Sequence, residues 1–210
     1  NKSMTEGTVP DDLKIAKIIP IYKSEDKKII SNYRPISILP AFSKILERLV
    51  YNRLLDFINK NDILSKNQYG FRENISTSMA LLDLVDKIST SIENNEFTIG
   101  IFIDLAKAFD TVNHNILLSK LYHYGVRGIP LDWFKSYLAN RHQYVSLNDT
   151  QSNKLPIKCG VPQGSILGPL LFLLYINDLS TVTKLLTFIM FADDTNIFIS
   201  GKNLNNINSI

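Results

Sequence analysis

The stretch Phe188-Ile-Met-Phe-Ala-Asp-Asp-Thr-Asn-Ile-Phe-Ile199 holds two adjacent carboxylates, Asp193 and Asp194, between two apolar runs. Both runs are rich in the β-branched and aromatic residues that strands favour, so the pattern predicts a hairpin. Thr195 and Asn196 can form a turn, and we therefore expect the acids at the hairpin tip. A solvated turn also tolerates two aspartates without any function, so the stretch alone leaves a polar turn and a functional site open.

A third carboxylate ends another apolar segment, Phe97-Thr-Ile-Gly-Ile-Phe-Ile-Asp104. The strict alternation predicts a strand, with Asp104 on the face opposite to Ile101 and Ile103. An acid at the end of a strand is either the N-cap of a following helix or a site residue, and the segment supports both interpretations equally.

Two strand-borne acidic positions are what a two-metal centre requires. Like charges ~4 Å apart repel by roughly 4 kcal/mol at an effective dielectric constant near 20, and bound divalent cations remove that cost. Oxygen ligands without thiolate or imidazole favour Mg²⁺ or Mn²⁺ over zinc. The single cysteine, Cys159, and the three histidines show no zinc-binding spacing. The pattern predicts two Mg²⁺ ions, with Mn²⁺ as an alternative metal.

Composition restricts the class of protein. The chain has 210 residues, of which 45% are hydrophobic, enough for the core of one large or two modest globular domains. We find no secretory signal and no apolar run near the ~20 residues that a membrane span needs, so no membrane partner is expected. One cysteine without a partner favours a reducing, intracellular setting, in the nucleus or the cytoplasm.

Charge is unevenly distributed along the chain. Residues 1 to 72 contain 13 Lys and Arg against 8 Asp and Glu, a balance of +5, and the remainder has a balance of −2. This asymmetry suits a protein that binds a phosphate backbone with one region and collects carboxylates for metal in another. A solvated charged face is the alternative, and charge by itself favours it.

Apolar periodicity predicts the remaining elements. Two positions stand out in the loops: Arg34 precedes Pro35 and should project from an extended, ordered loop, and Arg72 follows the turn at Gly70 and suits a phosphate contact. A loop with three glycines and two prolines, residues 160–169, matches neither G-x-G-x-x-G nor the Walker A spacing.

The elements that apolar periodicity predicts are a strand at 13–22, a helix from Pro40 to about Lys60, a helix with Leu81, Val85, Ile88 and Ile92 on one face, helices at 115–124 and 130–140, a hairpin at 143–158 and a helix at 170–179.

Five short motifs in a fixed order carry a family resemblance. They are Asn-Tyr-Arg-Pro-Ile-Ser (32–37), Gln-Tyr-Gly-Phe-Arg (68–72), Asp-Leu-Ala-Lys-Ala-Phe-Asp (104–110), Gly-Val-Pro-Gln-Gly-Ser (160–165) and Phe-Ala-Asp-Asp (191–194). The set resembles the reverse transcriptase of non-LTR retrotransposons, over about Leu13 to Ser200. A single motif has a high false-positive rate, but five in order make chance very improbable.

The resemblance implies an α+β fold shaped as part of a right hand, with an antiparallel palm sheet packed on helices. It implies a reverse transcriptase domain at 13–210 that is C-terminally incomplete, without a thumb, after an N-terminal flank at 1–12. The fingers are expected at about 13–96 and 119–154, and the palm at about 97–118 and 155–210. Thumb and endonuclease domains are expected in a full-length protein.

The resemblance also implies the roles of individual residues. Asp104 and Asp193 ligate both metal ions, the backbone carbonyl of Leu105 adds a ligand, and Asp194 supports the cluster; the three aspartates are the expected catalytic residues. Phe109 resembles the aromatic gate that excludes a 2′-hydroxyl, with an ordinary core Phe as the alternative. The other expected contacts are Arg72, Gln163 and Gly164 for the incoming nucleotide, and Arg34, Phe191 and Ala192 for template and primer.

The implied function is an RNA-directed DNA polymerase, a nucleotidyltransferase whose partners are an RNA template, a DNA primer and dNTPs. The alternative is a catalytically inactive nucleic-acid-binding fragment of a decayed or host-adopted element. A group II intron maturase or telomerase-like enzyme is a third possibility, which the Asp104–Asp110 motif makes less favourable. The motif residues Asp110, Asn113 and His114 receive no catalytic role from the sequence.

Overall fold

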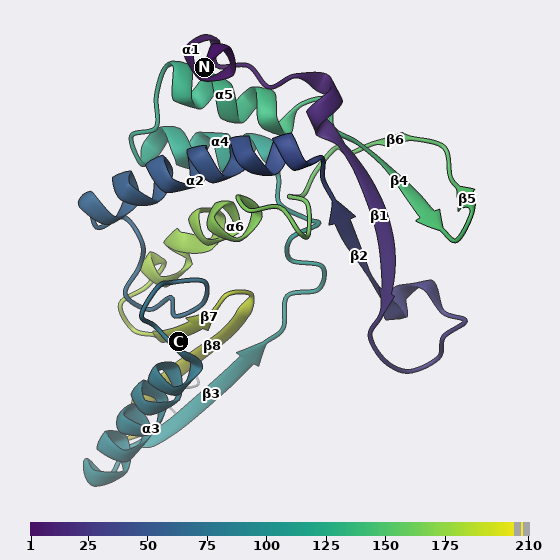
Figure 1. Ribbon diagram of the computed structural model, residues 1–210. Helices are drawn as coiled ribbons and strands as arrows, with labels where there is room; N and C mark the ends of the chain where they lie inside the picture. Colours follow the sequence, from purple (N-terminus) through teal and green to yellow (C-terminus); the bar gives the residue numbers. More distant parts are fainter. Residues whose placement is uncertain (204–206, 208–210) are drawn as a thin grey trace. The chain divides into compact units, whose positions relative to one another are not determined.

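The structure is a computed structural model that describes residues 1–203 and 207. The chain combines helices with two β-sheets, so the predicted mixed α+β class is confirmed (Figure 1). Contacts within the chain group it into two compact units. Unit 1 comprises Asn1–Asn61 and Phe109–Tyr175, and unit 2 comprises Asp62–Ala108 and Ile176–Ile210. The boundaries expected for fingers and palm stay a prediction.

Unit 1 contains a sheet of five strands in the order β2-β1-β4-β5, with β6 paired to β4. Strand β1 pairs antiparallel with β2 and parallel with β4, and the predicted hairpin closes through a turn at Asn148, whose φ is 50°. The expected strand at 13–22 and the expected hairpin are confirmed. The strands are β1 (Ile15–Tyr22), β2 (Tyr33–Ile38), β4 (His142–Leu147), β5 (Thr150–Gln151) and β6 (Leu155–Pro156).

The ordered loop expected around Arg34 is instead strand β2. Its Pro35 lacks an N–H group, and the register places it opposite Pro20 of β1. An antiparallel ladder tolerates two facing prolines at a pair whose N–H positions point away from the partner strand. Arg34 is exposed on this strand, opposite Ile21.

Four longer helices belong to unit 1, and their ends follow local signals. The Asn113 side chain caps α4 by accepting from the N–H groups of Asn115 and Ile116, and Pro130 stands in the first turn of α5. No helix in the described part of the chain is both long and apolar enough to cross a membrane. The helices and 3₁₀ turns are α1 (Lys2–Glu6), η1 (Asp11–Lys14), η2 (Ile30–Asn32), α2 (Ala41–Lys60), α4 (His114–His123), α5 (Ile129–Leu138) and α6 (Gly168–Ile176).

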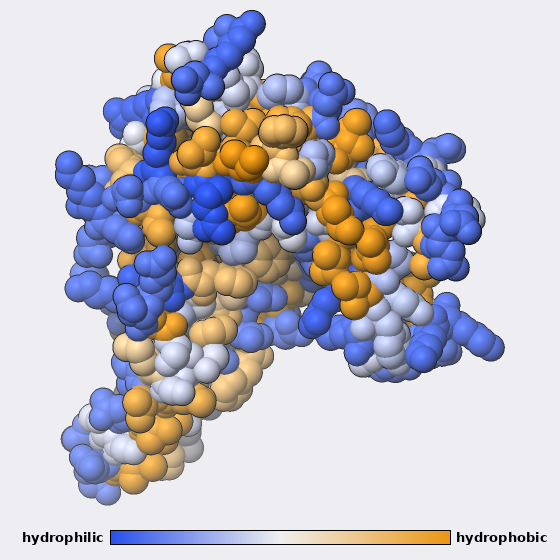
Figure 2. All heavy atoms as spheres, viewed as in Figure 1, coloured by the Kyte–Doolittle hydropathy of each residue, from blue (hydrophilic) through white to orange (hydrophobic). Residues whose placement is uncertain are grey.

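Helix α2 turns a different face to the core from the one that its apolar residues predict. Phe42, Ile45 and Leu49 are 73%, 56% and 50% exposed, and Figure 2 shows apolar side chains on the surface along this helix. The predicted helix is confirmed, but part of its apolar side faces solvent instead of the core. The buried positions are Ser43, Glu47, Val50, Leu54 and Ile58. Two of them, Ser43 and Glu47, are polar, and both form hydrogen bonds within the protein.

Unit 2 is built on an antiparallel sheet with the strand order β3-β8-β7. Helix α3 packs on it through Ala80, which joins Ile189 and Phe198 in one buried cluster (Figure 1). Strand β3 is an edge strand and Phe102 on it is 70% exposed. The elements of this unit are α3 (Thr77–Glu93), β3 (Phe97–Ile103), η3 (Asn177–Thr181), β7 (Thr187–Phe191) and β8 (Asp194–Gly201).

Candidate active site

The three candidate catalytic carboxylates lie at one end of the sheet of unit 2. The last pair of the β3–β8 ladder is Ile103 with Thr195, so Asp104 leaves β3 where Asp194 begins β8. Asp193 directly precedes it in the turn. Asp104 and Asp194 are exposed and Asp193 is partly buried. In the described part of the chain none of the three forms an ion pair with a cationic side chain.

The turn that carries Asp193 is a tight two-residue hairpin. Phe191 pairs with Asp194, which leaves Ala192 and Asp193 as the turn. The hairpin is therefore confirmed, but Thr195 and Asn196 are not turn residues. Both lie within β8, and Thr195 is 1% exposed. Ala192 has a φ of 58°, in the left-handed region that alanine rarely adopts.

The side chain of Gln68 brackets this turn. Its Oε1 accepts from Ala192 N at 2.9 Å and from Gly70 N at 2.8 Å, and its Nε2 donates to Ala192 O at 3.3 Å. The motif Gln68–Arg72 therefore lies against the catalytic hairpin, although the sequence offered a role only for Arg72. Both backbone polar groups of Ala192, an expected template or primer contact, are used within the protein.

Arg72 is partly exposed and folds back on its own loop. Its Nη1 donates to Ser65 O at 3.0 Å and to Gln68 O at 3.2 Å. The neighbouring Tyr69 donates to Asp83 Oδ2 at 3.0 Å. Partial burial, followed by the hydrogen bond to Asp83, raises the pKa of Tyr69, while the positive charge of Arg72 lowers it. The phosphate contact expected of Arg72 stays a prediction.

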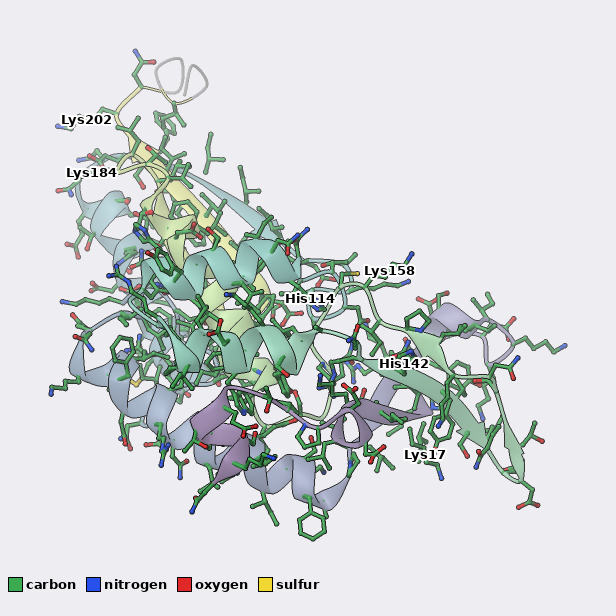
Figure 3. All side chains as sticks on the ribbon, turned by 90° about the horizontal axis from the view of Figure 1, so that it is seen from above. Lys17, His114, His142, Lys158, Lys184 and Lys202 are labelled. Carbon is green, nitrogen blue, oxygen red and sulfur yellow. The ribbon has the colours of Figure 1, made fainter. Side chains whose placement is uncertain are left out.

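In unit 1, residues 109–112 are hydrogen-bonded to the glycine-rich loop. Val161 N donates to Phe109 O at 2.9 Å, and Gly160 N donates to Val112 O at 2.7 Å. His114 Nε2 lies 2.8 Å from Gly160 O, and Figure 3 shows this ring close to the loop that carries Lys158. The end of the Asp104–Asp110 motif is therefore hydrogen-bonded to the start of the Gly160–Ser165 motif.

Two of the expected nucleotide contacts belong to these two segments and have defined partners. The ring of Phe109 stacks on Phe172 of α6, with centroids 4.8 Å apart and an angle of 27° between the planes. Gln163 Nε2 donates to both carboxylate oxygens of Asp110, at 3.0 and 3.1 Å. Phe109 and Gln163 are each partly buried, so part of each side chain faces solvent.

The glycine-rich loop also touches strand β2. Ser37 N donates to Gln163 O at 2.7 Å. Gly164 has a φ of 114°, and a Cβ atom there would lie 2.6 Å from Ser37 O. The motif that contains Arg34 therefore meets the Gln163 loop through the backbone, and only glycine allows that approach.

A buried polar network supports the far end of the same loop. Glu47 is 1% exposed; its Oε2 accepts from Ile166 N at 2.6 Å and its Oε1 accepts from Tyr137 OH at 3.0 Å. Burial, and next the negative charge of Glu47, raises the pKa of Tyr137 well above its usual value. Arg141 opposes that shift, and its guanidinium carbon lies 4.8 Å from the Tyr137 ring centroid.

The chain is similar to known proteins in sequence and in fold. Residues 21–207 match the family model described as reverse transcriptase (RNA-dependent DNA polymerase). The chain belongs to the reverse transcriptase family. Its fold resembles that of apo telomerase from Candida tropicalis truncated from its C-terminal domain, with a TM-score of 0.65 and 16% identity over 96% of this chain and 46% of that chain.

Two curated relatives of this reverse transcriptase come from mobile elements of a fly. It is 35% identical to the RNA-directed DNA polymerase from mobile element jockey of Drosophila melanogaster, over 97% of this chain and 23% of the relative. It is 37% identical to the probable RNA-directed DNA polymerase from transposon BS of the same fly, over 81% of this chain and 19% of the relative. The chain thus spans about a fifth to a quarter of the length of these relatives.

Reverse transcriptases use divalent metal ions, and the donor chemistry at this sheet end fits such an ion. Asp104, Asp193 and Asp194 offer oxygen ligands alone, which suit hard cations. Among residues 1–203 and 207, no three His, Cys, Asp or Glu side chains are close enough together to hold a metal ion as they stand. The chemical type of these ligands therefore suits a divalent metal ion, and the geometry in which they would bind it stays a prediction.

Sequence reasoning missed several residues that hold the site together. Gln68 and Asp110 stand inside motifs that were recognised, so their polar character next to an expected site residue was the available signal. Glu47 had a different signal, because it occupies the same helical stripe as Val50 and Leu54.

Proposed function

We propose that this chain is the polymerase portion of a non-LTR retrotransposon reverse transcriptase, an RNA-directed DNA polymerase that adds dNTPs to a primer 3′-hydroxyl on an RNA template. The observation that carries the proposal is the β3–β8 pairing, which brings Asp104 beside the Asp193–Asp194 turn. Nucleotidyl transfer by two metal ions requires carboxylates from neighbouring strands that are not already paired with a cationic side chain.

We assign the β3-β8-β7 sheet to the palm and the β1-β2 hairpin to the fingers of a right-handed polymerase. We assign none of the described residues to a thumb. The assignment is supported by the position of the acids at the end of the antiparallel sheet of unit 2, on the turn and at the strand end that β3 and β8 share.

Asp104, Asp193 and Asp194, with the Leu105 carbonyl, would hold two Mg²⁺ ions. When bound, these ions lower the pKa of the primer 3′-hydroxyl and stabilise charge on the leaving pyrophosphate. The carboxylates would orient the reacting groups. Their negative charges repel one another at short range, and a bound cation removes that repulsion. The exposure of Asp104 and Asp194 gives substrate and cations access to them.

The residues of unit 1 would select and hold the nucleotide. Gln163 and Gly164 form a surface on which a base pair can lie, with the backbone held by Ser37. Phe109, backed by Phe172, would present a rigid ring edge to the sugar and exclude a 2′-hydroxyl. Arg34 of the same unit would contact the template. In unit 2, Arg72 would bind triphosphate oxygens with guanidinium N–H groups other than those of Nη1.

Primer extension on an RNA template by the full-length protein tests the proposal. With Mg²⁺ and dNTPs present we expect extension, and we expect Asp193→Ala to reduce its rate by about three orders of magnitude or more. An unchanged rate in that variant would overturn the assignment of the site. A steep salt dependence of RNA binding without any extension would instead identify a nucleic-acid-binding protein without catalysis.

A further inference from the structure

We propose that Gln68 is a positioning residue of the polymerase site, whose buried amide holds the turn that carries Asp193 in one conformation. The inference rests on the proposed function for its catalytic consequence, but the geometry it explains is independent of that function. It gives a role to a residue whose motif was singled out only for its arginine.

The turn needs an external support because of its backbone conformation. Ala192 has a φ of 58°, and an alanine disfavours this left-handed region by about tenfold relative to ordinary conformations. Position 192 is an alanine, whereas glycine or asparagine usually occupies this position in such turns. A tight turn of this sequence therefore exchanges readily with other conformations unless contacts select one of them.

Gln68 supplies those contacts with both ends of its amide. Oε1 accepts from Ala192 N and Nε2 donates to Ala192 O, so the peptide groups on both sides of the Ala192 Cα atom are fixed. Because Gln68 is 1% exposed and Ala192 is 5% exposed, water cannot easily replace these bonds. A side chain must both accept and donate here, which an uncharged amide does and an ionised carboxylate does not.

The backbone around Gln68 is shaped for the same contact. Gly70 N donates to Gln68 Oε1 and fixes the orientation of the amide. A Cβ atom on Gly70 would lie 2.2 Å from Ala192 N, so this close approach requires glycine. Tyr69 N also donates to Met190 O, and Met190 N donates to Asn67 O, each at 2.8 Å. The segment thus holds both the turn and the strand that leads into it.

A buried amide could instead serve general stability, and the chain offers a matched control for that possibility. Asn177 is also buried in unit 2, at 7% exposure, and its amide also brackets backbone groups: Oδ1 accepts from Ser65 N at 2.7 Å and Nδ2 donates to Ile63 O at 2.8 Å. Asn177 makes none of these contacts to the hairpin. Gln68→Met and Asn177→Leu remove comparable hydrogen bonds with little change in volume.

Amide hydrogen exchange on the full-length protein tests the geometry without any reference to activity. We expect Gln68→Met to speed exchange at Ala192 and its hairpin neighbours by about tenfold or more, because the buried N–H loses its acceptor. Asn177→Leu should speed exchange near Ser65 and leave the hairpin protected. Equal protection of the hairpin in the wild type and in Gln68→Met overturns the proposal.

The Mg²⁺ dependence of primer extension tests the catalytic consequence. At equal amounts of folded protein, Gln68→Met should raise the Mg²⁺ concentration for half-maximal extension by about tenfold, and Asn177→Leu should leave it unchanged. Loosened hairpin exchange with an unchanged Mg²⁺ requirement overturns the positioning role. Failure of the wild type to extend primers refutes the proposed function, while the exchange experiment still decides whether Gln68 holds the turn.

Two further variants keep the test decisive. If Gln68→Met does not fold, Gln68→Glu takes its place, since it keeps an acceptor for both N–H groups but loses the donor to Ala192 O. It should speed exchange at the hairpin relative to the wild type, and unchanged exchange overturns the proposal. In the Gln68→Met background, Ala192→Gly removes the penalty of the left-handed conformation and should restore part of the hairpin protection. No restoration would show that the backbone of residue 192 is not what Gln68 holds, which overturns the mechanism.

Discussion

Both carboxylate oxygens of Asp110 accept hydrogen bonds from the side-chain amide of Gln163, at 3.0 and 3.1 Å. The contact uses the donor end of that amide, so its acceptor end is the one left for other partners. Gly160 lies directly against this acid, since a Cβ atom there would be 2.7 Å from Asp110 O. The last residue of the Asp104–Asp110 motif therefore orients a side chain that we assign to nucleotide binding.

Substitution of Asp110 should accordingly weaken nucleotide binding. A hydrogen bond to a charged acceptor contributes about 1.5–3 kcal/mol, so Asp110→Ala should raise the KM for dNTP by roughly 10- to 100-fold, with a smaller effect on kcat. Asp110→Asn keeps one acceptor and should lie between that variant and the wild type. Single-nucleotide extension over a range of dNTP concentrations measures both constants, and Asp132→Ala, at an exposed ion pair on α5, is the control.

Replacement of Phe109 should relax discrimination against ribonucleotides. In Phe109→Val the ring edge is lost, so incorporation of rNTP relative to dNTP should rise by about tenfold or more. The ratio of kcat/KM for the two nucleotides is the measurement, and Phe134→Leu, at a buried position of α5, is the control for a general packing defect. If Phe109 is only a core residue, stability will fall while the ratio stays at its wild-type value.

Gly164 should tolerate substitution less well than a second glycine of the same unit. Gly164 and Gly128 both have positive φ values, 114° and 61°, but a Cβ on Gly164 meets Ser37 O at 2.6 Å while a Cβ on Gly128 meets nothing within 4 Å. Both alanine variants pay for backbone strain, and Gly164→Ala adds a backbone clash that should cost about 1–3 kcal/mol more. Urea unfolding compares the two, and equal losses would contradict the close approach of the loop to β2.

The buried Tyr137 should make stability depend on alkaline pH. Burial and the charge of Glu47 raise its pKa in the folded protein, so its contribution is fully present below the unfolded value of about 10 and declines as pH rises above it. In Tyr137→Phe the unfolding free energy should decline less as pH rises, because the titrating hydroxyl is absent. At neutral pH this variant should be about 1–3 kcal/mol less stable than the wild type, because Glu47 loses a donor. Unfolding free energies at pH 8 and at pH 10.5 measure the difference, and identical pH slopes in both proteins would refute it.

Local patterns of the sequence determined most of the elements and the identity of the family. Alternating apolar residues predicted β3 and the hairpin of β7 and β8, and helical periodicity predicted α2, because both patterns depend on neighbours a few positions away. The acids at the strand ends could be recognised for the same reason. The turn was misjudged at Thr195, where β-branched residues beside an acidic pair satisfy a strand as well as a turn.

Only the tertiary structure decided which residues support the candidate site. Gln68 and Ala192 are 124 positions apart in the sequence, and Asp110 and Gln163 are 53 apart, so no local pattern relates them. Glu47 could be assigned to the core only once Tyr137 and Ile166 N were known to face it. Buried polar groups are stable only with specific partners, and those partners are chosen by how the whole chain folds. The sequence by itself determined the reactive groups, and the fold decided what holds them in position.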